Sequence, residues 1–235
     1  IDIGSSAHSV SDHTQTNWNG VIGGINMQAL PSLAIDNIQI YPDIKGKKAD
    51  IKIYLDGQPN NSRLALNVIF DGKTILKKEV RVKPNAKNCV EETIEWEDSV
   101  KLWSEFTPNV YSLRAVLSSQ DGNSEKEISF GFRDFGVNGT HFAINGRPTF
   151  LRGTLECCIF PMTGYPVMDN TYWAKIYSTC KRYGLNHIRF HSWCPPKAAF
   201  HVADSLGMYL QVECGGWASI GDGNKQDQWF KEEGD

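Results

Sequence analysis

The chain has 235 residues, of which 40% are hydrophobic and 22% are charged, and its formal net charge is −3. These values are ordinary for a globular protein with a buried core, and the length suits more than one domain. The sequence has no basic patch that would favour a nucleic-acid partner and no run of about 20 apolar residues that would predict a membrane span.

The first stretch, residues 1–29, is polar and rich in Ser, Asn and Gly. It shows little periodicity and is too short for a domain, so we interpret it as the end of a structure that lies upstream. The chain also begins without methionine. We therefore expect it to be a portion of a longer protein.

Residues 31–133 carry the pattern of β-strands. Short alternating or β-branched stretches are bounded by Pro, Gly, Asn and Asp, and include "ADIKIYLDG" and "NVYSLRAVLSSQDG". Asp71-Gly72 and Asp121-Gly122 are hairpin signals. About seven strands in roughly 100 residues are typical of an immunoglobulin-like β-sandwich. The cysteine spacing does not match the antibody pattern, so we expect no disulfide between the sheets.

Residues 134–235 change to alternating strands and helices. A hairpin at Asn145-Gly146 is followed by the strand "TFLRGTLE", a helix "TYWAKIYSTCKRY" capped by Asp169 or Asn170, and the strand "HIRFH". A second helix, "KAAFHVADSL", follows Pro195-Pro196, and the strand "MYLQVE" comes after it. The order β-α-β-α-β predicts parallel strands with right-handed crossovers.

Polar residues gather where these three strands end, at Glu156, His191 and Glu213. Ligands of parallel α/β folds bind at the carboxyl ends of the strands. Strand alternation puts Arg189 on the same side as His191, while Ile188 and Phe190 face the opposite way. The alternative is that these polar side chains only pair with one another. His187 starts its strand, and we interpret it as a structural or surface residue. Three such strands form either a small open sheet or the first part of an eight-stranded barrel, which needs about 250 residues.

The six cysteines include no Cys-x-x-Cys pair, which argues against a zinc site, and we interpret them as buried free thiols. We expect neither a metal nor a cofactor. The seven tryptophans suit either a core or the binding of sugar rings.

Several motifs now resemble those of family 2 glycoside hydrolases, the β-galactosidase, β-glucuronidase and β-mannosidase group. The junction of sandwich and barrel in that family has a Phe-Gly-Phe-Arg box, an Asn-Gly hairpin and a Leu-Arg-Gly strand, in this order. The matching positions here, followed by those of the later loops and strands, are Phe130-Gly131-Phe132-Arg133, Asn145-Gly146, Leu151-Arg152-Gly153, Pro161, Gly164, Asn186, Arg189, Asp204, Gly207 and Glu213. The segment "DHTQTNWNGVIGGI" is similar to the end of the family's jelly-roll domain.

The resemblance implies three regions: the end of a jelly-roll sugar-binding domain (1–29), an immunoglobulin-like sandwich (30–133) and the N-terminal part of a TIM-barrel catalytic domain (134–235). It implies part of a retaining, exo-acting β-glycosidase that uses two carboxylates about 5–5.5 Å apart. In the family the acid/base follows an Asn on barrel strand four and the nucleophile lies on strand seven. The chain contains no Asn-Glu pair. We expect both glutamates beyond Asp235 and no hydrolysis by the chain alone.

The resemblance also implies roles at the strand ends. Arg189 matches an arginine that positions the catalytic carboxylates, and Glu213 matches the acidic residue that closes strand three. The family's Arg-x-Ser-His-Tyr-Pro pattern is altered, because Ser192 stands where the family has His, and Cys157 stands where a His is common. The predicted sugar-binding residues are Arg189, His191, Ser192, Trp193, Glu156, Glu213, Trp217, Asn17 and Trp18.

A second hypothesis is a non-catalytic carbohydrate-binding or scaffolding module that uses Trp193, Trp217 and Trp18. In either case the expected partner is a carbohydrate, with no nucleic acid and no membrane. A partial barrel exposes strand edges and apolar faces, so we expect the chain either to associate with another copy or to be only marginally stable alone. The family's habits favour a periplasmic or secreted location.

Overall fold

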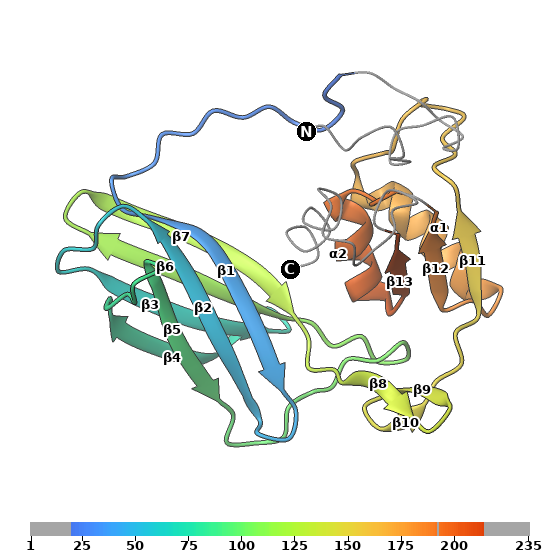
Figure 1. Ribbon diagram of the computed structural model, residues 1–235, viewed down its shortest axis with the longest axis horizontal. Coiled ribbons are helices and arrows are strands. Elements are labelled where there is room, and N and C mark those ends of the chain that lie inside the picture. Colours follow the sequence, from blue (N-terminus) through green and yellow to red (C-terminus); the bar gives the residue numbers. More distant parts are fainter. Residues whose placement is uncertain (1–19, 192, 214–235) are drawn as a thin grey trace, which may run out of the picture. The chain divides into compact units, whose positions relative to one another are not determined.

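The computed structural model describes residues 20–191 and 193–213 (Figure 1). The chain forms two compact units, one of residues Asn26–Thr149 and one that includes the residues from Phe150 onward. Ser192, Trp217, Asn17 and Trp18, four of the predicted sugar-binding residues, lie outside the described part of the chain.

The first unit is built around a β-sandwich of two antiparallel sheets (Figure 1). One sheet has the order β1-β2-β5 and consists of β1 (Ala34–Asp43), β2 (Lys48–Asp56) and β5 (Cys89–Glu95). The other has the order β4-β3-β6-β7 and consists of β3 (Arg63–Phe70), β4 (Lys73–Arg81), β6 (Tyr111–Ser119) and β7 (Gly122–Phe130). The seven strands and both Asp-Gly hairpins agree with the sequence pattern.

A single hydrophobic core lies between the two sheets. In β2 every second side chain is buried, from Ala49 through Ile51 and Ile53 to Leu55, because successive side chains of a strand point to opposite faces. Inward-facing residues of β3 and β6, such as Leu66 and Leu113, meet them from the other sheet. The alternation seen in the sequence is therefore the alternation between core and solvent.

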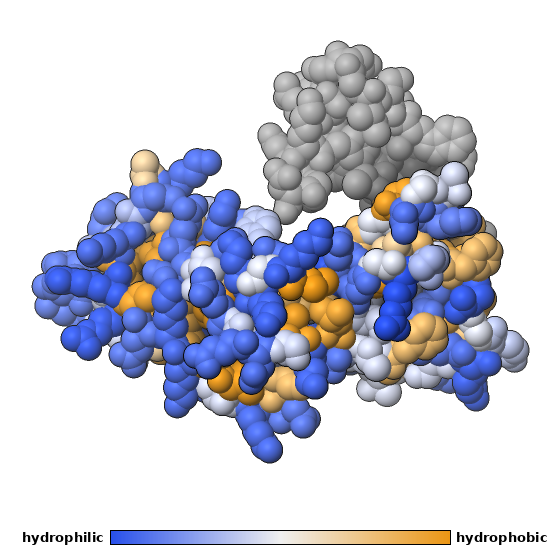
Figure 2. Space-filling model, turned by 90° about the horizontal axis from the view of Figure 1, so that it is seen from below, coloured by the Kyte–Doolittle hydropathy of each residue, from blue (hydrophilic) through white to orange (hydrophobic). Residues whose placement is uncertain are grey.

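An ion pair joins the edges of the two sheets. Nζ of Lys78, on the edge strand β4, lies 2.7 Å from a carboxylate oxygen of Glu92 on β5 and also donates to the carbonyl of Thr93. Lysines on an edge strand discourage pairing with the strands of another molecule. The face of the molecule in Figure 2 is accordingly mostly hydrophilic over the sandwich.

A small antiparallel sheet follows the sandwich in the same unit. It has the order β10-β9-β8 and consists of β8 (Phe135–Asn138), β9 (His141–Ile144) and β10 (Arg147–Pro148). Asn145 and Gly146 have φ values of 52° and 78°, as a type I′ hairpin turn requires. The Asn145 amide also donates to the carbonyl of Trp103 and accepts from the backbone N–H of Asp134. The Asn-Gly turn thus also ties this sheet to the end of the sandwich.

The second unit contains a parallel sheet of order β11-β12-β13, made of β11 (Gly153–Glu156), β12 (His187–Phe190) and β13 (Tyr209–Val212). Helix α1 (Asn170–Arg182) connects the first two strands and α2 (Lys197–Leu206) connects the last two. The predicted β-α-β-α-β order is confirmed. In the described residues, no helix is long and apolar enough to cross a membrane.

The helix ends agree with the sequence signals. Asp169 caps α1 by accepting from the N–H groups of Thr171 and Tyr172, at 2.7 and 3.1 Å. Gly207 ends α2 in the left-handed conformation, with φ of 73°. Nζ of Lys181, in the last turn of α1, donates to the carbonyl of Leu206 at the end of α2. This contact joins the C-terminal ends of the two helices.

Candidate functional site

The two helices pack on one face of the parallel sheet. Ile188 and Phe190 of β12 are buried against this layer, in a core that also contains Trp173 and Tyr177 of α1. Arg189 lies between them in sequence and faces the opposite side. The strand therefore has one apolar face and one polar face, as the alternation of its residues predicts.

The opposite face of the sheet carries exposed side chains in register. Leu155 pairs with Arg189 and Arg189 pairs with Gln211, so these three side chains form a row across the three strands. Leu155 is 52% exposed. Both faces of a parallel sheet are normally covered, so an apolar side chain with this exposure marks a face that such sheets normally bury.

Arg189 and Glu213 form an ion pair at the carboxyl end of the sheet. Nε of Arg189 donates to Oε1 of Glu213 at 2.5 Å, and a second guanidinium nitrogen contacts the same oxygen. The side chain of Arg189 is 51% exposed and that of Glu213 is 22% exposed. A pair of this kind contributes at most about 1 kcal/mol to stability. The polar side chains at the strand ends thus pair with one another, which was the alternative to a ligand-binding role. The Arg189 guanidinium nevertheless stays accessible to solvent.

Glu156 is directed toward the backbone of its own loop. Its two carboxylate oxygens accept from the N–H groups of Cys158 and Ile159, at 3.0 and 3.1 Å. Burial raises the pKa of this carboxyl, against the opposing effect of the two N–H donors and of the nearby Trp193 indole. Cys158 has a left-handed φ of 59°. Glu156 thus stabilises an unusual turn after β11.

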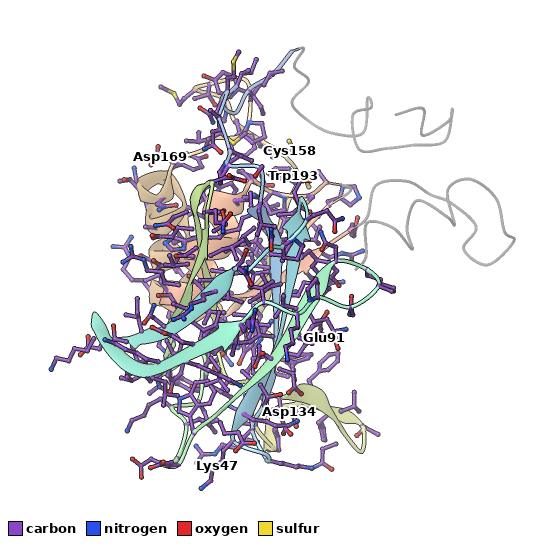
Figure 3. All side chains as sticks on the ribbon, turned by 90° about the vertical axis from the view of Figure 1, so that its left-hand side faces the viewer. Lys47, Glu91, Asp134, Cys158, Asp169 and Trp193 are labelled. Carbon is purple, nitrogen blue, oxygen red and sulfur yellow. The ribbon has the colours of Figure 1, made fainter. Side chains whose placement is uncertain are left out.

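Trp193 is a core residue in the described structure. Its side chain is 4% exposed, and its ring meets Phe160 and Phe190 edge-to-face, with centroids 5.7 and 5.4 Å away. Cys158 and Trp193, both labelled in Figure 3, belong to the same hydrophobic cluster. The indole Nε1 lies near Glu156 without hydrogen-bond geometry. The ring is therefore covered by protein and offers no face to a sugar here.

His191 follows β12 and is partly exposed. Its backbone N–H donates to the carbonyl of Glu156 at 2.8 Å, which extends the hydrogen bonding of β11 and β12 by one residue. Of the predicted sugar-binding residues that the structure describes, Arg189, Glu213 and His191 keep some exposure, while Glu156 is occupied by backbone groups and Trp193 is buried.

The five described cysteines are free, but they do not share one environment. Cys89 and Cys158 are buried, as predicted, and burial raises the pKa of the Cys158 thiol to about 12. Cys157 and Cys180 are partly exposed, and Cys194 is exposed, so the prediction of burial is wrong for it. Within the described ranges, no three His, Cys, Asp or Glu side chains are grouped so that they could hold a metal ion.

Gly153, from the Leu-Arg-Gly motif, is required by its neighbour on β12. Gly153 and His187 are paired in register, and a Cβ atom at position 153 would lie 2.4 Å from Nδ1 of His187. The imidazole therefore occupies the space above the glycine. Burial lowers the pKa of His187 below its usual value of 6.5, and the charge of Arg189 lowers it further. His187 is structural, as the sequence suggested.

This pKa predicts a pH dependence of stability. Because the folded state holds His187 with a lowered pKa, the unfolded state binds the proton more readily. The stabilisation is complete above about pH 6.5 and is lost as the pH falls toward the folded-state pKa. We expect amide exchange in β11 and β12 to accelerate, relative to the sandwich, as the pH falls from about 7 to about 5 after correction for intrinsic exchange rates.

The His187→Gln variant should show less of this acceleration, whereas His201→Gln, on the exposed surface of α2, should behave as the parent chain does. The comparison between variants also separates the effect of His187 on stability from that of Glu156. The raised pKa of Glu156 makes the folded state more stable, not less, as the pH falls. Equal pH dependence of His187→Gln and the parent chain would contradict the assignment.

Asn186 is the residue that sequence reasoning placed in a motif without a role. It is buried, its Oδ1 accepts from the N–H of Arg152 at 2.7 Å, and its Nδ2 donates to the carbonyl of Phe150 at 3.0 Å. Its backbone bonds Arg152 on one side and Tyr209 on the other. The Asn186 side chain takes up the hydrogen-bonding groups of Phe150 and Arg152. Strand β11 therefore begins at Gly153, whereas the sequence predicted a start at Thr149. The signal available in the sequence was an Asn directly before a predicted strand.

Comparisons with known proteins show which families and structures the chain resembles. Residues 33–133 match the family model described as glycosyl hydrolases family 2. The chain is 26% identical over 208 residues to a β-galactosidase of Pseudoalteromonas haloplanktis, covering 83% of this chain and 20% of that protein. It is 22% identical over 228 residues to a β-galactosidase large subunit of Latilactobacillus sakei, covering 92% of this chain and 35% of that protein.

Solved structures with the same fold include two β-glucuronidases. A structure from Parabacteroides merdae superimposes with a TM-score of 0.67 at 19% identity, covering 85% of this chain and 26% of that one. One from Bacteroides uniformis also gives 0.67, at 21% identity, covering 87% and 26%. The resemblance to glycoside hydrolase family 2 is confirmed by the family model over residues 33–133 and by these relatives. The chain spans between about a fifth and a third of the length of these curated relatives.

Proposed function

We propose that the chain is part of a retaining, exo-acting β-glycosidase of the β-galactosidase kind. Residues 30–133 would be its immunoglobulin-like sandwich, residues 134–235 would begin its TIM-barrel catalytic domain, and residues 1–29 would end its jelly-roll domain. The carbohydrate substrate would bind at the carboxyl ends of the barrel strands. The family match supports the proposal at the level of the class of enzyme.

The observation that carries the proposal is the asymmetry of the parallel sheet. In the described residues, α1 and α2 pack on one face, whereas the row of Leu155, Arg189 and Gln211 occupies the other. Helices outside and side chains inside are the arrangement of a TIM barrel, where the inward face is filled by side chains. The exposure of Leu155 fits a position that further strands would cover.

Within this proposal, the Arg189–Glu213 pair has a positioning role. Its half-exposed guanidinium keeps N–H donors available to a further carboxylate, and arginine holds carboxylates in a defined planar geometry. Glu213 fixes the orientation of the guanidinium through Nε. His191 is retained as a candidate sugar contact. Glu156 and Trp193 would instead support the loop after β11 and the core beneath the site.

The proposal is tested on the protein encoded by the whole gene, with nitrophenyl β-galactoside and β-glucuronide as substrates. We expect hydrolysis with retention of the anomeric configuration by NMR, and a loss of kcat/KM on the order of 100-fold for Arg189→Gln, because misplaced catalytic groups lose about this much. The 235-residue chain by itself should hydrolyse neither substrate.

Arg114→Gln is the matched control. Arg114 also forms a two-nitrogen ion pair with a glutamate, Glu125, but on the exposed face of the sandwich. It should keep the parent's kcat/KM within about twofold, since the removal of a surface ion pair costs little. Turnover by the 235-residue chain, or equal activity of Arg189→Gln and Arg114→Gln, would contradict the proposal.

A further inference from the structure

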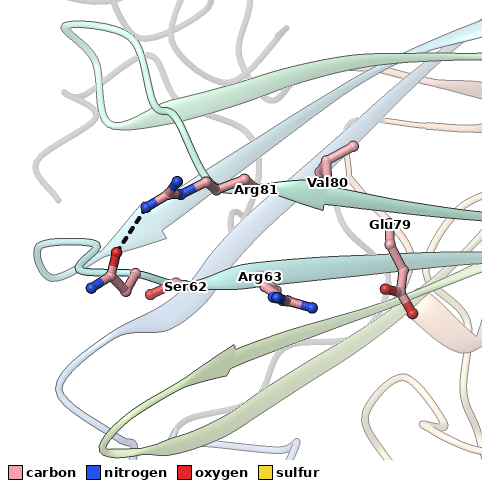
Figure 4. A pocket seen from close by; sticks show the side chains of 6 residues that line it. Ser62, Arg63, Glu79, Val80 and Arg81 are labelled. Atoms are coloured by element: carbon pink, nitrogen blue, oxygen red, sulfur yellow. Dashed lines mark hydrogen bonds between the residues drawn. The ribbon is translucent and has the colours of Figure 1, made fainter.

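A pocket of about 470 Å³ lies on the sandwich, where β3 begins and β4 ends (Figure 4). Its lining consists of Asn61, Ser62, Arg63, Glu79, Val80 and Arg81. All six residues belong to the unit Asn26–Thr149, so the pocket lies within one compact unit. Its volume is in the range of about 300–1,000 Å³ that is typical of sites for small molecules.

Two arginines on neighbouring strands line this pocket. Arg63 and Arg81 are directly opposite in the antiparallel register of β3 and β4. Like charges in directly opposite positions destabilise a sheet. Elsewhere in the same sheet a cation is matched by a carboxylate, since Arg114 on β6 pairs with Glu125 on the neighbouring β7 at 2.6 Å. The Arg63–Arg81 pair is therefore a local departure from the charge pattern of this sheet.

Among the described residues, neither arginine of this pair forms an ion pair. Arg81 donates to Oδ1 of Asn61 at 2.8 Å, drawn as the dashed line in Figure 4, and this acceptor is uncharged. Glu79 is on the same strand face as Arg81 and pairs in register with Ala65. It has no ion pair within the part of the chain that the structure describes. The three side chains together leave one net positive charge.

The wall of the pocket is held in place. Asn61 has a left-handed φ of 48°, and its side chain is fixed by Arg81. Ser62 is buried, its hydroxyl donates to the carbonyl of Asn60, and its own carbonyl accepts from the N–H of Val82. A fixed wall lowers the entropy that binding must overcome.

We propose that this pocket binds a hydroxylated organic monoanion, a sugar acid, through its carboxylate. The guanidinium groups of Arg63 and Arg81 take the carboxylate oxygens, because planar N–H donors match the geometry of an oxyanion. Glu79 accepts from a hydroxyl of the same molecule and disfavours ligands of higher negative charge. The inference depends on the sandwich alone and does not rest on the proposed glycosidase activity.

The test is a titration of the 235-residue chain with sodium D-glucuronate, followed through the ¹⁵N-labelled arginine side-chain signals at constant ionic strength. The Nε–H signals of Arg63 and Arg81 should shift in a saturable manner, with glucuronate binding more tightly than acetate and glucose producing no shift. Arg63→Gln should weaken binding by about tenfold or more, the effect of losing a hydrogen bond to a charged group.

Two further variants complete the design. Glu79→Gln removes the opposing charge and should tighten acetate binding while reducing the preference for glucuronate over acetate. Arg114→Gln, on the same sheet but outside the pocket, should bind both anions as the parent chain does. Shifts that stay linear in concentration, or equal binding by Arg63→Gln and the parent, would overturn the site. Equal affinity for glucuronate and acetate would overturn the assignment to a sugar acid.

Discussion

Gly57→Ala is expected to destabilise the sandwich by about 3 kcal/mol or more. Gly57 has a φ of +95°, and a Cβ atom there would lie 1.9 Å from the backbone carbonyl oxygen of Ser32. Strained backbone costs about 1–3 kcal/mol and forced overpacking adds a similar amount. The loop cannot move away easily, since the Asn88 amide donates to the carbonyls of both Gly57 and Leu55, at 2.8 and 2.7 Å. Urea unfolding of the chain followed by far-ultraviolet circular dichroism measures the loss.

Gly72→Ala separates the clash from the backbone conformation. Gly72 has a φ of +71° in the β3–β4 turn, and a Cβ atom there would meet nothing within 4 Å. This variant should therefore lose only about 1 kcal/mol, the effect of a left-handed conformation without a contact. The same midpoint shift for both variants would show that the approach of Ser32 to Gly57 has no energetic consequence.

Trp173→Ala is expected to destabilise the α/β unit by about 3–5 kcal/mol, the range for removing a large aromatic side chain from a core. The side chain is fully buried, and its ring contacts Phe160, Tyr177 and Phe190 with centroids 6.2, 5.8 and 6.1 Å away. Its Nε1 donates to the carbonyl of Val167 at 2.8 Å. The substitution removes the contact of this ring with Phe190 of β12 and the hydrogen bond that holds the preceding loop.

Hydrogen exchange with mass spectrometry localises this effect. Peptides that contain β11, β12 and β13 should lose protection in Trp173→Ala, while peptides of the sandwich should keep theirs, because the chain has two compact units. Tyr183→Ala, at a position 81% exposed at the end of α1, serves as the control and should leave both sets unchanged. Equal loss of protection in the two units would contradict a separate α/β core.

The sequence predicted the features that depend on neighbours along the chain. Asn145-Gly146 specifies its turn because few residue pairs adopt two consecutive left-handed conformations. Asp169 and Gly207 end their helices through backbone groups within a few residues. Ile188 and Phe190 reveal the buried face of β12 by alternation alone. Each of these is a local rule, so one sequence is sufficient to apply it.

The candidate site was harder to predict because its side chains are committed to distant partners. Arg189 finds Glu213, 24 positions later, only when β12 and β13 pair. Trp193 follows a polar strand end, which suggested a sugar platform, yet the rings of Phe160 and Phe190 cover it. Glu156 stands at the end of a strand, where a ligand-binding residue is expected. Its carboxylate oxygens instead accept hydrogen bonds from backbone N–H groups of the following turn. Composition and alternation carry no information about these choices.

The position of Asn186 has a consequence for how the parallel sheet opens. Its side chain and backbone hold Phe150 and Arg152 ahead of β11, and its carbonyl holds Tyr209 of β13. These bonds link all three strands at their N-terminal ends, in addition to the pairing of β12 with each neighbour. The sheet should therefore open as one cooperative element, with the amide protons of β11, β12 and β13 exchanging at a common rate rather than fraying from one edge.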